Sequence, residues 1–177
     1  IAAITGLIHH EHADVAAVAE ARLRKLLGSK SPLARTLAAQ AVGEIGLQHL
    51  HQPLLALLQD DDMEVRRAAV VAAGQLKNSH LWPALIDSLS IKAVRSAAIS
   101  ALSNGDVSII PLLAFALSTI RAEFEAGSET RRNLAQQIIR LASRLRNTPL
   151  LEAHINFPHA AIREQILAAL AQMKYHT

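Results

Sequence analysis

Asp62-Met63-Glu64-Val65-Arg66-Arg67-Ala68-Ala69 is the stretch that decides the fold, and Ala93-Val94-Arg95-Ser96-Ala97-Ala98 repeats its second half. In both copies an Arg precedes small apolar residues. The third and the seventh residue after Arg66 and after Arg95 are apolar, which places them on one face of an α-helix. The stretch therefore predicts a helix that buries one side.

The same Arg recurs along the chain and marks an internal repeat. Its intervals are 31, 29, 36 or 37, and 32 or 31 residues, because two adjacent Arg residues compete in the fourth unit. The positions are Arg35, Arg66, Arg95, Arg131 or Arg132, and Arg163. An apolar run upstream of the last four begins with a Pro, at Pro53, Pro83, Pro111 and Pro149. The pattern therefore predicts that each unit consists of a first helix, a turn and a second helix.

Capping residues agree with this division. Side-chain acceptors for the first helical N–H groups occur at Ser31, Asp62, Ser90, Ser128 and Thr148. Residues that favour helix ends occur at Gly46, Asn78, Asn104, Gly127 and Asn147. We expect helices at 14–27, 34–45, 51–59, 63–77, 80–89, 92–103, 107–125, 130–146, 149–155 and 160–173. The unit from Pro111 to Arg131 has about seven extra residues within 119–128, which should lengthen its first helix or its loop.

The composition favours closely packed helices. Of the 177 residues, 51% are hydrophobic but only 3% are aromatic, and seven Gly and six Pro are too few for a turn-rich β fold. The chain has no Cys, which excludes disulfides and thiolate metal sites and fits a reducing, cytoplasmic setting. The apolar segment 107–120 is too short to span a bilayer. An apolar start at Ile1 without Met leads us to expect a piece of a longer protein.

The stretches 62–69 and 93–98 resemble the second-helix signature of HEAT repeats, and the resemblance extends over residues 31–177. It implies an all-α α-solenoid of about five stacked antiparallel helix-turn-helix repeats, with residues 1–177 as a single domain. Stacking would create a concave face lined by the second helices. In the family, Asp and Arg form an inter-repeat ladder. Only Asp60 and Asp61 lie at the expected place here, so we expect most of the ladder to be lost.

The second helix of the fourth unit carries the candidate binding residues. Its expected core face consists of Leu134, Ile138, Leu141 and Leu145. Polar residues recur at intervals of four on another face, as Arg132, Gln136, Arg140 and Arg144. A second basic cluster comprises Arg22, Arg24, Lys25, Lys30 and Arg35. Such a stripe attracts phosphates or acidic protein surfaces, although an ordinary solvated face would look the same.

Three functions remain open. The leading interpretation is a non-catalytic protein-binding scaffold or regulatory module that uses the concave face. The alternative is binding of nucleic acid or another polyanion through the Arg stripe, which the scarcity of aromatic residues disfavours. The third function, a HEAT-like enzyme (lyase, hydroxylase or DNA glycosylase), is the least favoured, because no set of a nucleophile and a base can be assembled from the sequence.

Two local motifs point weakly to chemistry. The segment His9-His10-Glu11-His12 offers metal-ligating side chains, but no second pair recurs, and we expect no metal and no cofactor. The pair Trp82 and Asp87 is too little for a glycosylase site, and we expect Trp82 to serve in packing. The other His residues near hairpin turns, His154 and His159 among them, are expected to be solvated.

Overall fold

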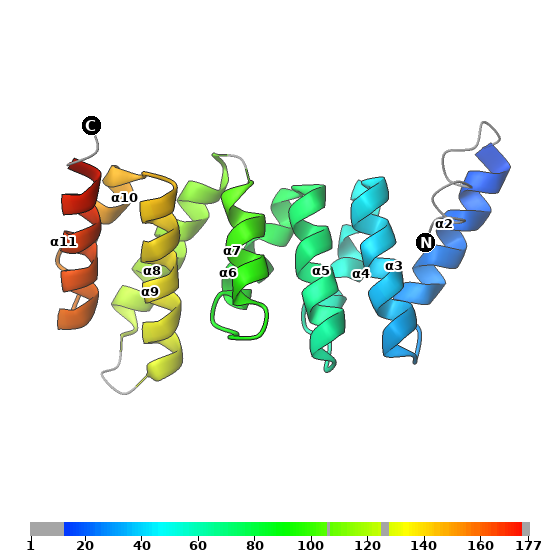
Figure 1. The fold of residues 1–177 in the computed structure, drawn as a ribbon, viewed down its shortest axis with the longest axis horizontal. Coiled ribbons are helices and arrows are strands. Elements are labelled where there is room, and N and C mark those ends of the chain that lie inside the picture. The colour runs from blue at the N-terminus through cyan, green and yellow to red at the C-terminus, as the bar shows by residue number, and fades with distance from the viewer. Residues whose placement is uncertain (1–12, 106, 125–127, 175–177) are drawn as a thin grey trace.

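The computed structural model describes residues 13–105, 107–124 and 128–174, which form an all-α repeat solenoid. The first helices of the hairpins are α2 (Ala13–Leu27), α4 (His51–Leu57), α6 (Trp82–Ser88), α8 (Ile109–Ala122) and α10 (Thr148–Glu152). The second helices are α3 (Pro32–Ile45), α5 (Met63–Leu76), α7 (Arg95–Ser103), α9 (Glu129–Arg144) and α11 (Ala160–Lys174). Short 3-10 turns, η1 (Gln48–Leu50) and η2 (Ser79–Leu81), precede α4 and α6. The second helices stand side by side in a row (Figure 1).

Most of the expected helix boundaries are confirmed. Ser31, Asp62 and Ser128 each accept a backbone hydrogen bond at the start of α3, α5 and α9. Gly46 ends α3 in the left-handed conformation with φ 79°. The extra residues of the fourth hairpin lengthen its first helix, since α8 has 14 residues where α4 and α6 have 7. Gly127 lies outside the described residues.

Other boundaries differ from the prediction. Helix α7 begins at Arg95 rather than at residue 92, and Ser90 does not cap it, because the Ser90 hydroxyl donates to the carbonyl of Asp87 instead. Asn78 and Asn147 do not end helices. Their side chains accept backbone hydrogen bonds at the starts of η2 and α10. An Asn can cap the start of a helix, where its side chain accepts from an unpaired N–H group, and it can also end a helix. Sequence position alone therefore does not distinguish the two roles.

The repeated Arg is a clamp between the two helices of a hairpin. Its guanidinium donates to a carbonyl six residues earlier, at the end of the preceding first helix or in the turn, in four of the five hairpins. These bonds join Arg35 to Ser29, Arg66 to Asp60, Arg95 to Leu89 and Arg163 to Phe157. In the fourth hairpin Arg131 donates to the carbonyl of Glu123 at 2.5 Å and pairs with its carboxylate at 3.2 Å. Arg131, not Arg132, is therefore the equivalent residue.

One rung of the inter-repeat ladder is present. Asp60 accepts from Nε and Nη2 of Arg35 at 2.6 and 2.7 Å, and the Asp60 side chain is 9% exposed. Its place in two later hairpins is taken by Leu89 and Phe157, which offer no carboxylate. The hydrogen bonds from Arg35 lower the pKa of the Asp60 carboxyl. The expected loss of most of the ladder is confirmed at those two positions.

Small residues bring neighbouring second helices close together. A Cβ on Gly43 would lie 2.7 Å from the Cα of Ala72, and a Cβ on Gly74 would lie 2.9 Å from the Cα of Ala101. In each pair the Gly is the eighth residue after the repeated Arg of its hairpin, and the Ala is the sixth residue after the repeated Arg of the next hairpin. The corresponding pair between α7 and α9 is Ser103 and the buried Gln137, both larger. Helix α9 accordingly packs less on α7 than on α11.

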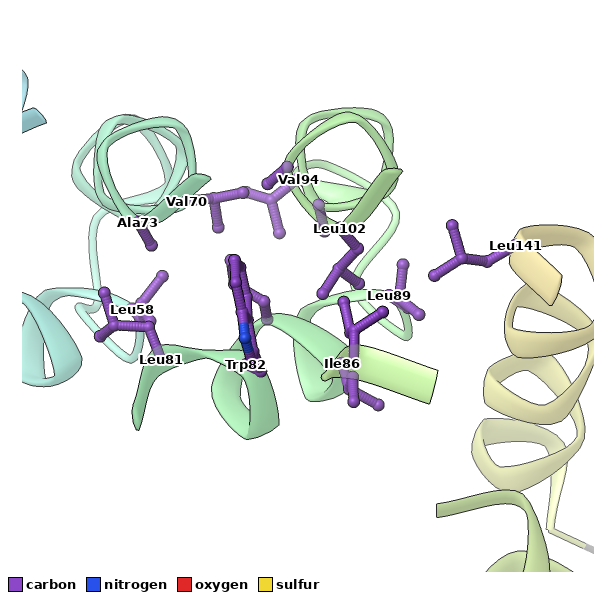
Figure 2. Packing of buried hydrophobic residues seen from close by; sticks show 14 of the residues in the cluster. Leu58, Val70, Ala73, Leu81, Trp82, Ile86, Leu89, Val94, Leu102 and Leu141 are labelled. Carbon is purple, nitrogen blue, oxygen red and sulfur yellow. The ribbon is translucent and has the colours of Figure 1, made fainter. Parts of the chain in front are cut away.

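Trp82 belongs to the core, as expected. It is fully buried and extends from α6 between α5 and α7, beside Val70, Ala73 and Leu102 (Figure 2). Burial of so large a side chain contributes substantially to stability. The core runs through the stack from Leu23 to Leu170.

Replacing Gly74 by Ala should destabilise the chain. The added Cβ would overlap the backbone of Ala101, so α5 and α7 must separate, at a cost of about 1–3 kcal/mol that outweighs the better helix propensity of Ala. Gly28→Ala is the control, because a Cβ there meets only one carbonyl at 3.9 Å. Denaturant unfolding measures both. Equal stability of the two variants would show that the close contact is unimportant.

Asp60→Asn should lower stability at neutral pH by about 1–2 kcal/mol, since a charge-assisted bond is replaced by a neutral one. Because folding lowers the pKa of Asp60, this stabilisation is complete above the pKa of the unfolded chain and is lost as the pH falls through the folded value. The melting temperatures of wild type and variant should therefore converge below about pH 4. The exposed Asp61→Asn is the control. A constant difference across pH would contradict the role given to this rung.

Candidate functional site

The outward residues of the second helices form one surface, which we call the B face. They lie one, five and nine residues after the repeated Arg, a spacing that keeps them nearly above one another. The exposed members are Gln40, Glu44, Arg67, Val71, Gln75, Ser96, Ser100, Asn104, Arg140, Glu164, Ala168 and Gln172, followed by Arg144 one further turn along α9. Most are neutral and small or amide-bearing. The B face is thus polar with little net charge.

The predicted stripe lies on α9 but is only partly exposed. Arg140 and Arg144 are exposed, whereas Arg132 and Gln136 are half-buried, and the expectation that Arg132 is exposed is wrong. Residues at intervals of four advance by about 40° per step on a helix with 3.6 residues per turn, so the four positions spread over about 120° and the first two lie toward the neighbouring helix. Toward the start of α9 the stripe turns toward α11, where the amide of Gln165 donates to the carbonyl of Gln136 at 3.0 Å.

The opposite side of α9 faces the core, as predicted. Ile138 and Leu141 are buried, and Leu134 and Leu145 pack on the core while partly exposed. The guanidinium groups of Arg132, Arg140 and Arg144 form no hydrogen bond or ion pair with any described residue. In the other basic cluster, Arg35 is committed to Asp60, so that cluster is smaller than the sequence indicates.

A hollow of about 550 Å³ opens on the B face between α5 and α7. Its lining is small or capable of hydrogen bonding, and consists of Val71, Gly74, Gln75, Lys77, Ala97, Ser100, Ala101 and Asn104. Val71 is 45% exposed. Amide and hydroxyl groups beside a modest apolar patch suit the backbone and side chains of an extended peptide. No sequence pattern predicts this hollow, and the run of small residues at the helix contact is its only signal.

Histidine side chains take several structural roles. His154 is buried, with Nδ1 2.9 Å from the carbonyl of Leu150 and Nε2 3.1 Å from Oγ of Ser118, so the expected solvation is wrong. The imidazole joins α10 to α8, and no local sequence pattern predicts this contact. His159 is also partly buried, against the ring of Phe124. The segment His9-His10-Glu11-His12 lies outside the described residues.

Within the described parts of the chain, no three His, Asp or Glu side chains gather closely enough to hold a metal ion. Trp82 is enclosed in the core, while Asp87 lies on the exposed side of α6, so the two do not share a pocket. No helix among residues 13–105, 107–124 and 128–174 is long and apolar enough to cross a membrane.

Arg residues of two kinds should respond differently to the same substitution. The double change Arg140→Gln and Arg144→Gln removes exposed charges without partners and should alter stability by less than about 0.5 kcal/mol per site. Arg95→Gln removes bonds to the carbonyls of Leu89 and Ser90 and should cost about 1–2 kcal/mol. Thermal melts followed by circular dichroism measure both. A large loss in the double variant would make these residues structural.

The comparisons with known proteins concern the fold. A family model described as HEAT repeats matches residues 20–103. A crystal structure of an engineered protein from a structural genomics consortium is 16% identical, with a TM-score of 0.44 over 97% of this chain and 95% of that one. The comparison with curated proteins finds no match. Residues 20–103, which include α3, α5 and α7, therefore match the HEAT-repeat family.

Proposed function

We propose that residues 1–177 are a single non-catalytic domain that binds a protein through the B face. The hollow between α5 and α7 is the observation that carries this proposal, because a volume of about 550 Å³ accommodates several side chains of an extended segment. HEAT repeats form helical scaffolds whose neighbouring second helices present a continuous surface. The hollow lies between the close-packed helices α5 and α7, so we expect it to bind with little backbone rearrangement.

The chemistry of the hollow favours a peptide over a charged polymer. Gln75, Ser100 and Asn104 supply both donors and acceptors, which can pair with backbone amide groups of a bound chain. Lys77 is the one charged residue in the lining, and it adds a preference for a nearby carboxylate. Val71 offers an apolar contact on the B face. Together these groups recognise a segment with small polar and acidic residues.

Capture from a lysate of the source cells tests the proposal with two matched variants. Val71 and Val18 are both exposed, so Val71→Glu and Val18→Glu should fold equally well, but only Val71 lines the hollow. The wild type and Val18→Glu should retain the same protein, and Val71→Glu should lose it, because an acidic side chain occupies the apolar contact. Retention by all three, or by none, would contradict a binding site on the B face.

Polyanion binding is the second candidate, favoured by the unpaired guanidinium groups of Arg140 and Arg144. The described aromatic residues argue against nucleic acid, since Trp82 and Phe157 are fully buried and none lies on the B face. Filter binding of a single-stranded homopolymer RNA at increasing salt distinguishes the two functions. Binding that weakens with salt and is lost in the double Gln variant would support the polyanion.

A further inference from the structure

A second, apolar cleft lies between α6 and α8, with Leu134 of α9 also in its lining. Its volume is about 360 Å³, within the range of pockets that accept one or two large side chains. The principal lining residues are Ile86, Asp87, Leu112, Phe115, Ala116 and Ile120. The cleft belongs to first helices, so it is separate from the B-face hollow between α5 and α7.

The cleft follows from the unequal lengths of the two helices. Helix α8 has 14 residues and α6 has 7, so α8 is about 10 Å longer than its neighbour and the shorter helix cannot cover its whole length. The weak packing of α9 on α7 falls at the same junction between the third and fourth hairpins. Phe115, on α8, is 72% exposed. A large aromatic side chain exposed beside an apolar cleft is typical of a protein-binding site.

Asp87 is the one charged group of this cleft. Its carboxylate forms no ion pair or hydrogen bond with any residue that the structure describes. Arg66 lies across an adjoining hollow from Asp87, but its guanidinium already donates to the carbonyls of Gln59 and Asp60. Partial burial against the apolar lining raises the pKa of the Asp87 carboxyl.

The other polar group of the lining is already satisfied. The hydroxyl of Thr119 donates to the carbonyl of Phe115 at 3.0 Å, within α8. A bound group therefore meets an apolar surface and a single uncompensated negative charge. Charge complementarity then requires a cation next to an apolar body.

We propose that the cleft between α6 and α8 docks a segment of a partner protein in which a large apolar side chain lies beside a Lys or Arg. The apolar side chain enters between Ile86 and Ala116 and covers the ring of Phe115. The cation reaches Asp87 at the rim. A protein segment fits better than a small molecule, because the cleft is open along one side and only a surface can cover Phe115.

A random peptide library displayed on phage tests this site directly. The library is first depleted on Ala116→Trp, whose indole fills the cleft, and is then selected on the wild-type chain. The peptides that remain are those that require an open cleft. Ala122→Trp is the matched control, because Ala122 lies exposed on the same helix and does not line the cleft. Circular dichroism establishes that each variant is folded. Phe115→Ala and Asp87→Asn serve as second variants if Ala116→Trp unfolds.

The expected peptides combine an aromatic or branched apolar residue with a neighbouring Lys or Arg. They should bind Ala122→Trp like the wild type and Asp87→Asn at least about tenfold more weakly, the loss expected for one charge-assisted contact. No enrichment, peptides without a basic residue, or equal binding to Asp87→Asn would overturn the proposal. A dimer of the chain alone that Phe115→Ala dissociates would also overturn it, by making a second copy the occupant. Val71→Glu should leave this binding unchanged, which separates the site from the B face.

Discussion

The spacing between neighbouring second helices is the constraint on which the rest of the structure depends. Where Gly43 meets Ala72 and Gly74 meets Ala101, the absent Cβ lets two backbones approach within contact of each other. Gly74 and Ala101 also line the B-face hollow. In α9 the position of Ala72 and Ala101 is occupied by the larger Gln137, and α9 packs less closely on α7. The junction between the third and fourth hairpins is therefore the loosest in the stack. Both candidate sites therefore derive from the way the helices pack.

Arginine has two separate uses in this chain. The repeated Arg of each hairpin donates to carbonyls at the turn, where the first helix leaves acceptors unpaired, and so it fixes the angle between the two helices. Arg140 and Arg144 belong to the same residue type but project from the outer side of α9. The position within the repeat, not the residue type, decides which role an Arg has. Only the second kind is available to a partner.

The architecture was predictable because periodic signals report on local geometry. Helical spacing and capping residues such as Ser31 and Asp62 placed most helices within a few residues. Features that depend on distant neighbours were not predictable. The burial of His154 requires Ser118, which lies on another helix, and the choice of Arg131 over Arg132 depends on Glu123. The α6–α8 cleft requires the relative length and placement of two helices, so neither helix reveals it alone.

Native-state hydrogen exchange tests most directly the claim that helix spacing governs the stack. In a linear array each hairpin is stabilised by its neighbours, so a loose junction divides the array into units that open separately. The amides of α3, α5 and α7 should open with one common free energy, and those of α9 and α11 with another. A single opening free energy across both groups would contradict the account, because the α7–α9 junction would then transmit stability as well as the close-packed ones.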